Sequence, residues 1–175
     1  MQETPQQYTQ RILGYSEGKQ PLRVQQATAR KLSALTRRLN KKQLTRRPAP
    51  GKWSIAEILA HLADAELVGG WRLRLILGSS GTPIQAFDQE VWAQTFNYSR
   101  RNPKASLEMF RVLRENNLTL LKSVPKGLWD NYGMHAEPQA SAALVPEQVP
   151  ADARRVTKDA TGVNVLVEVR KPSHA

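Results

Sequence analysis

The segment Pro50–Asp64 constrains the fold of this chain most, because it starts a helix and sets a histidine on its inner face. Ser54 and Glu57 have the Ser-x-x-Glu spacing of a capping box, in which each side chain satisfies a backbone N–H that the first helical turn leaves unpaired. The helix should therefore begin at Ser54, and His61 falls within its apolar stripe. The stripe consists of Ile55, Ile58, Leu59, Leu62 and Ala65. A buried imidazole needs a partner, and a metal ion is a candidate.

Apolar periodicity predicts three long helices. They cover about residues 21–40, from Ser54 to about Leu77, and from Asn102 to about Val124. A long crossover separates the second from the third, and Phe87–Trp92 within it should form a short helical turn. The residues expected to face inward are Leu22, Ala29, Leu32, Leu35 and Leu39 in the first helix, and Leu107, Phe110, Leu113, Leu118, Leu121 and Val124 in the third. An up-and-down bundle needs a fourth helix to close its core.

The segment 138–175 differs from the rest of the chain, because it contains no Phe, Trp or Tyr and is interrupted by Pro138, Pro146 and Pro150. Gln139–Val145 and Ala151–Ala160 are weak helical candidates, since such short pieces form no stable helix alone. The alternating valines of 163–169 predict a short strand with no obvious partner. We therefore expect a helical bundle over 1–137 and an atypical tail that is poorly ordered or loosely docked. A fourth helix in that tail is doubtful.

The charge of this chain is strongly uneven. Its net charge is +11, and residues 18–56 contain 11 Lys or Arg with no Asp or Glu. Such a field attracts polyanions or acidic ligands. The simpler interpretation is a solvated basic face on an outer helix, because no aromatic residue lies between Lys19 and Lys52 and no nucleic-acid-binding motif is visible. Binding to nucleic acid is therefore the least favoured function.

The chain contains no cysteine, which excludes disulfides, thiolate metal sites and cysteine nucleophiles. Any metal must therefore be bound by His, Asp or Glu. A reducing cytoplasm is the compartment that this composition favours. No apolar run approaches the ~18 residues of a membrane helix, and the N-terminus carries no secretory signal, so we expect a soluble cytoplasmic protein.

Several segments together resemble the DinB-like superfamily, also called DinB/YfiT-like, over about residues 1–137. They are Pro48–Leu77 with its Trp71-Arg72 pair, Phe87–Trp92 and Leu113–Asn117. The resemblance implies an all-α four-helix bundle with a long crossover between helices two and three. It also implies a zinc or nickel ion held by three histidines, one on helix two and two in a His-x-x-x-His on helix four. The implied activity is that of a metal-dependent hydrolase or of a transferase that joins a small thiol to an electrophile.

The metal ligands are where the sequence departs from that family. His61 matches the first ligand, but no His-x-x-x-His occurs anywhere in the chain, and only His135 and His174 remain. A rebuilt site would combine His61 and His135 with a carboxylate such as Asp64. The alternative is that His135 is a loop histidine with no role in metal binding. Losing two of three nitrogen donors should abolish useful affinity, because one imidazole competes poorly with bulk water.

Asp64 is the catalytic candidate, since it follows His61 by one helical turn and could orient that ring or a substrate. The alternative is a solvent-facing or salt-bridged carboxylate, with Arg72 or Arg74 as its partner. The tryptophans expected to line the core or a pocket are Trp53, Trp71 and Trp92.

Three functions from different classes are compatible with the sequence. The first is a DinB-like metal-dependent hydrolase or thiol transferase that acts on an unknown small molecule and is impaired by its missing ligands. The second is a non-catalytic helical bundle that associates, for instance as a homodimer through apolar helical faces. The third is a basic nucleic-acid-binding protein, which would show a steep loss of affinity with salt.

Overall fold

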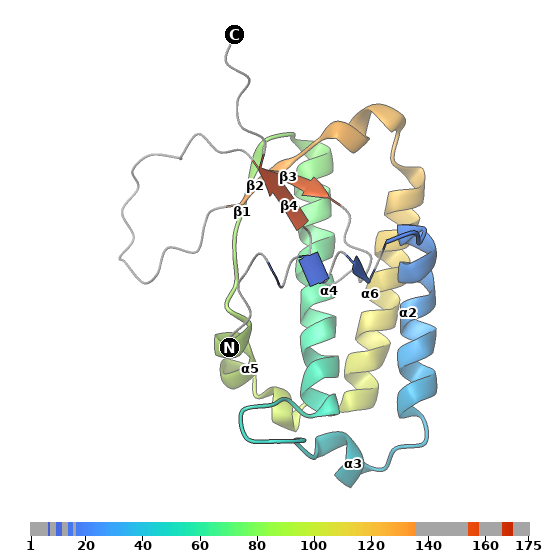
Figure 1. The fold of residues 1–175 in the computed structure, drawn as a ribbon, viewed down its shortest axis with the longest axis vertical. Coiled ribbons are helices and arrows are strands. Elements are labelled where there is room, and N and C mark those ends of the chain that lie inside the picture. The colour runs from blue at the N-terminus through green and yellow to red at the C-terminus, as the bar shows by residue number, and fades with distance from the viewer. Residues whose placement is uncertain are drawn as a thin grey trace, which may run out of the picture.

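A computed structural model gives the fold, and three long helices dominate it (Figure 1). It describes residues 7, 10, 11, 14, 15, 17–135, 154–157 and 166–169. The long helices are α2 (Pro21–Thr36), α4 (Ile55–Gly78) and α6 (Pro103–Ser123). Helix α6 lies between the other two and packs against both. The predicted helical-bundle class is confirmed, and so is the long crossover between α4 and α6.

Shorter elements connect the helices and form two small sheets. They are α3 (Lys41–Thr45), β1 (Thr82–Ile84), α5 (Gln89–Thr95), the 3₁₀ helices η1 (Tyr98–Arg100) and η2 (Lys126–Asp130), β2 (Gly133–His135), β3 (Arg154–Thr157) and β4 (Leu166–Val169). Strand β1 pairs with β2 in parallel, and β3 pairs with β4 in antiparallel fashion. None of the described helices is long and apolar enough to cross a membrane.

The structure corrects two expectations for the tail. The strand predicted at 163–169 has a partner, because β4 pairs with β3. Strand β3 lies inside Ala151–Ala160, so the helical candidate there is wrong at 154–157. A helix of this length is unstable on its own, whereas pairing of the two strands satisfies their backbone hydrogen-bonding groups. The candidate Gln139–Val145 lies outside the described residues.

Side-chain caps fix where the helices begin. Glu57 N–H donates to Ser54 Oγ at 3.3 Å, and Ser54 N–H donates to Glu57 Oε2 at 2.8 Å, so the predicted capping box is confirmed. The helix predicted over 21–40 instead ends at Thr36. Asn40 starts a new helix with its own capping box, and its extended backbone is incompatible with a helix that continues through it.

The described core lies chiefly between α4 and α6. It includes Ala56, Leu59, Ala60, Ala63, Phe110, Leu118 and Leu121. The alanines allow close packing, and a Cβ at Gly70 would meet the Asn117 side chain at 2.4 Å. Three predicted core or wall positions are wrong: the exposed fractions of Leu35, Trp71 and Ile58 are 72%, 61% and 41%. Helical spacing identifies a stripe, but the neighbouring helices decide which part of it they cover.

Candidate metal site around His61

His61 lies half-buried on the second turn of α4, where the Trp53 ring packs edge-on against it at a centroid distance of 5.1 Å. Its Nδ1 atom is shielded from solvent and has no hydrogen-bond partner in the described part of the chain. Burial lowers the pKa of His61, so the imidazole is neutral near pH 7. A neutral imidazole with an unpartnered nitrogen is the form that binds a metal ion.

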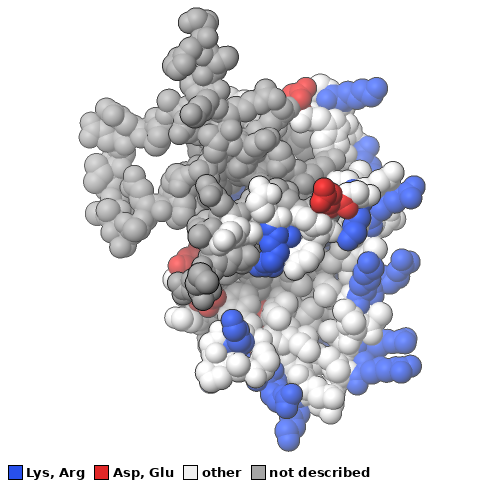
Figure 2. All heavy atoms as spheres, viewed as in Figure 1, with Lys and Arg blue, Asp and Glu red and all other residues white. Residues whose placement is uncertain are grey.

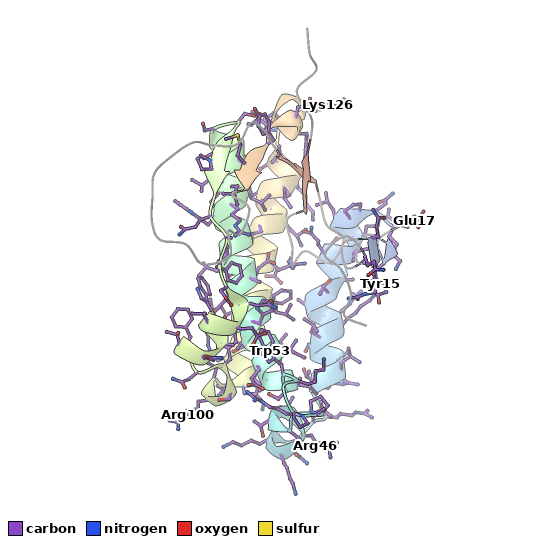
Figure 3. The ribbon with its side chains drawn as sticks, turned by 60° about the vertical axis from the view of Figure 1, so that its left-hand side comes forward. Tyr15, Glu17, Arg46, Trp53, Arg100 and Lys126 are labelled. Carbon is purple, nitrogen blue, oxygen red and sulfur yellow. The ribbon has the colours of Figure 1, made fainter. Side chains whose placement is uncertain are left out.

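Asp64 is buried and bound by two residues of the crossover. The Tyr98 hydroxyl donates to Asp64 Oδ2 at 2.8 Å, and Arg101 Nη1 lies 2.8 Å from both carboxylate oxygens. Burial and the hydrogen bond to Asp64 raise the pKa of Tyr98, which keeps the hydroxyl protonated as a donor. Figure 3 shows how the crossover and Arg100 lie beside the N-terminal half of α4.

The salt-bridged alternative for Asp64 is therefore the observed state, although its predicted partners are wrong. Arg101 forms the ion pair, whereas Arg72 donates to a backbone carbonyl and Arg74 binds the side chains of two asparagines on α6. Arg72 lies eight residues beyond Asp64 on the same helix, a rise of about 12 Å, so the two side chains cannot meet.

The described residues do not complete a metal site. No group of three His, Asp or Glu side chains is placed to hold an ion within the part of the chain that the structure describes. His61 fits the role of a first ligand. Asp64 is engaged instead by Tyr98 and Arg101, whose three hydrogen bonds use most of the roughly four acceptor positions of its carboxylate.

The backbone of His135 lies in β2, far from His61. Its neighbour Gly133 packs against Ile76, which is fifteen residues beyond His61 and hence about 22 Å along the helix axis. Two extended residues recover about 7 Å of that separation at most. The described backbone therefore does not bring His61 and His135 together. The side chain of His135, and the whole of His174, lie outside the described residues, so a metal role for His135 stays a prediction.

A pocket of about 490 Å³ adjoins the site, and Trp53 belongs to its wall. The other walls are polar and carry both charges, with Arg47 and Glu57 on one side and Glu90 and Gln94 of the α5 region on another. The ring that packs against His61 therefore also faces a space large enough for a small polar molecule.

Glu57 is expected to make the protein acid-sensitive. Its ion pair with Arg47 and its bonds to Ser54 lower the pKa of Glu57 from 4.5 to about 2. A carboxylate with a depressed folded pKa stabilises the fold fully above pH 4.5, and the contribution is lost as the pH falls toward 2. Urea unfolding should show that, between pH 4.5 and about 2, the free energy of unfolding of the unchanged protein falls by on the order of 1–2 kcal/mol more than that of Glu57→Gln. Equal acid sensitivity would contradict this role for Glu57.

A second buried ion pair was missed at the sequence level. Arg114 Nη2 lies 2.6 Å from Glu66 Oε2, and Asn117 Nδ2 donates to Glu66 Oε1 at 2.8 Å. The Glu66 and Arg114 side chains are only 5% and 2% exposed, and Arg114 also covers the Phe110 ring. Arg114 and Asn117 form part of the motif that carries the family resemblance. Their position next to the apolar stripe of the third helix was the available signal for burial.

Comparisons with known proteins agree on one family. The sequence profile of the DinB superfamily matches residues 25–149. A protein of Halalkalibacterium halodurans named "Putative metal-dependent hydrolase" is 27% identical over 54% of each chain. One of the same name from Oceanobacillus iheyensis is 38% identical over 31% of this chain and 32% of its own length. The chain thus spans about half or less of the curated relatives that it matches.

A solved structure supports the same assignment at the level of the fold. YfiT from Bacillus subtilis, described as having an unusual four-helix bundle topology, aligns with a TM-score of 0.62. The alignment covers 66% of both chains at 21% sequence identity. The profile match extends over more than two thirds of the sequence, from α2 into the tail. This chain therefore belongs to the DinB superfamily.

Proposed function

We propose that this protein is a metal-dependent hydrolase or thiol transferase of the DinB type whose metal centre is incomplete, so that its activity is impaired. The observation that carries the proposal is the state of the two donors on α4. His61 presents a free, buried nitrogen, whereas Tyr98 and Arg101 occupy the oxygens of Asp64. One monodentate imidazole holds a divalent ion poorly against water.

The family supports the catalytic part of the proposal. The relatives that match this chain carry names of metal-dependent hydrolases. A complete centre would supply a metal-activated water or thiol as the nucleophile. In this chain, the pocket lined by Trp53, Arg47 and Glu57 is the space in which a small substrate would lie beside His61.

Metal titration tests the proposal. Zinc or nickel added to the 175-residue chain, in competition with a chelator of known affinity, should remain with the chelator. His61→Phe should leave that result unchanged, because no tight site exists to be lost. The variant keeps the contact with Trp53 and removes an unsatisfied buried nitrogen, so it should raise the free energy of unfolding by about 1 kcal/mol.

The pH dependence provides the internal control for that experiment. Because burial lowers the pKa of His61 below 6.5, the unfolded chain takes up a proton first as the pH falls, and unfolding becomes easier below about pH 6.5. His61→Phe should lack that loss of stability. One tightly bound metal per chain that disappears in His61→Phe would instead show that His61 belongs to a complete centre, and it would refute the proposal.

A further inference from the structure

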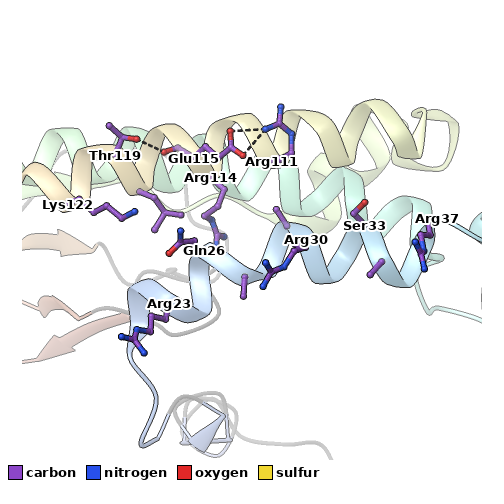
Figure 4. A pocket seen from close by; sticks show the side chains of 14 residues that line it. Arg23, Gln26, Arg30, Ser33, Arg37, Arg111, Arg114, Glu115, Thr119 and Lys122 are labelled. Carbon is purple, nitrogen blue, oxygen red and sulfur yellow. Dashed lines mark hydrogen bonds and ion pairs between the residues drawn. The ribbon is translucent and has the colours of Figure 1, made fainter.

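A basic groove runs between α2 and α6 (Figure 4), and His61 is not among the residues that line it. Its volume is about 910 Å³. Helix α2 contributes Arg23 and Arg30, and Arg37 follows at its C-terminal end. Helix α6 contributes Arg111 and Lys122 from the opposite side. Figure 2 shows Lys and Arg side chains along the edge of the molecule where α2 runs.

The three α2-side arginines form a ladder. Arg23, Arg30 and Arg37 are spaced by seven residues, so they share one helical face at intervals of about 10 Å. In the part of the chain that the structure describes, none of the three forms an ion pair. The acidic side chain among the lining residues is Glu115, and Arg111 already binds it at 2.7 Å. Among the described residues that line the groove, the positive charges of Arg23, Arg30 and Arg37 are therefore uncompensated.

Small and apolar side chains lie between the charged ones. The groove wall includes Ala27 and Ala34 of α2 and Leu118 of α6, which is buried beneath it. Small residues allow another backbone to approach closely, and an apolar floor stabilises a partner that brings an apolar stripe. None of the described residues that line the groove is aromatic, so they offer no platform on which nucleic-acid bases could stack.

We propose that this groove binds an acidic amphipathic helix of a partner protein. The partner helix would lie along α2 and α6, with a stripe of its own small apolar side chains in contact with Ala27, Ala34 and Leu118. Carboxylates at seven-residue intervals would then meet Arg23, Arg30 and Arg37. Helix-in-groove recognition uses this combination of an apolar stripe and flanking charge. A nucleic acid would match the charge but not the apolar floor.

Peptide binding to the 175-residue chain tests the proposal. The probe is a labelled helical peptide of three heptads, with an Ala/Leu stripe flanked by glutamates at seven-residue spacing. Fluorescence anisotropy should show binding that weakens with added salt. The triple variant Arg23→Glu, Arg30→Glu, Arg37→Glu should bind it about tenfold more weakly or worse. The same variant should gain binding to a peptide in which lysine replaces each glutamate. This gain would show that the variant is folded, because it requires an intact groove.

Three further arms separate the proposed site from a general effect of charge. The matched control replaces Lys31, Arg38 and Arg46 with glutamate. These residues are not among those that line the groove, so the affinity for the acidic peptide should change by less than about twofold. If this control variant loses as much affinity for the acidic peptide as the groove variant does, the proposed site is refuted. Absence of peptide binding also refutes it. A duplex DNA or single-stranded RNA that binds more tightly through the same arginines would show a nucleic-acid surface instead of a helix-binding groove.

If the triple variant does not fold, Arg30→Glu alone decides the question. Arg30 is exposed and forms no ion pair in the described part of the chain, so its reversal should leave the fold intact. The paired control is Lys31→Glu, the same change of charge at the next residue of α2. If Arg30→Glu binds the acidic peptide more weakly than the unchanged chain does, and Lys31→Glu does not, the result supports the groove as the binding site. Equal effects overturn it.

Discussion

Glu66→Ala is expected to lower the free energy of unfolding by about 3–5 kcal/mol. The carboxylate is buried between α4 and α6, where it binds both Arg114 and Asn117. Removing it leaves the Arg114 guanidinium, which is almost fully buried, without its ion-pair partner Glu66. A buried charge that loses its partner costs more than the pair contributed when intact. Urea unfolding at neutral pH measures the loss.

The control for this prediction is Glu115→Ala, at a solvent-exposed position of α6. Glu115 pairs with Arg111 at 2.7 Å, but both side chains are largely exposed, so the expected loss is within about 1 kcal/mol. The double variant Glu66→Leu, Arg114→Met should recover much of the loss, since it removes both charges together. If Glu66→Ala and Glu115→Ala cost the same, the Glu66 pair does not stabilise the bundle as described.

Asp64→Asn is expected to lower the free energy of unfolding by about 2–3 kcal/mol. The neutral amide loses the charge that binds Arg101 and keeps only one acceptor oxygen, whereas Arg101 contacts both carboxylate oxygens and Tyr98 donates to Oδ2. The cost is smaller than at Glu66, because Arg101 is partly exposed and water can solvate it. Thermal or urea unfolding, read by circular dichroism, checks the value.

The partners of Asp64 supply the controls. Tyr98→Phe removes one hydrogen bond and should cost about 1 kcal/mol. A double-mutant cycle with Arg101→Met should show that the Asp64 and Arg101 effects do not add, since each removes the same ion pair. If Asp64→Asn leaves stability unchanged but abolishes an activity or metal binding, Asp64 is catalytic and its structural role is wrong.

Local signals in the sequence predicted much of the fold. The capping box at Ser54 and the Asn102-Pro103 start of α6 depend on residues within a few positions, and both starts are confirmed. The crossover helix was expected over Phe87–Trp92 and forms as α5, which Asp88 caps. Such features are readable because the interacting groups are neighbours along the chain.

The missed features depend on contacts between distant parts of the chain. Arg101 lies 37 residues beyond Asp64, and Arg114 lies 48 residues beyond Glu66. The helical spacing of apolar residues indicates that a charged residue lies next to a buried stripe, but it does not indicate which distant residue forms the ion pair with it. The outward position of Leu35 has the same origin, because the stripe of α2 does not reveal which side α6 will cover.

The most direct test of the incomplete metal centre is elemental analysis of the purified 175-residue chain after exhaustive dialysis. The state of His61 and Asp64 predicts zinc and nickel contents far below one equivalent, unchanged in His61→Phe. A content of about one zinc or nickel per chain, lost in His61→Phe, would show that other residues complete the site. That result would contradict an incomplete metal centre in this chain.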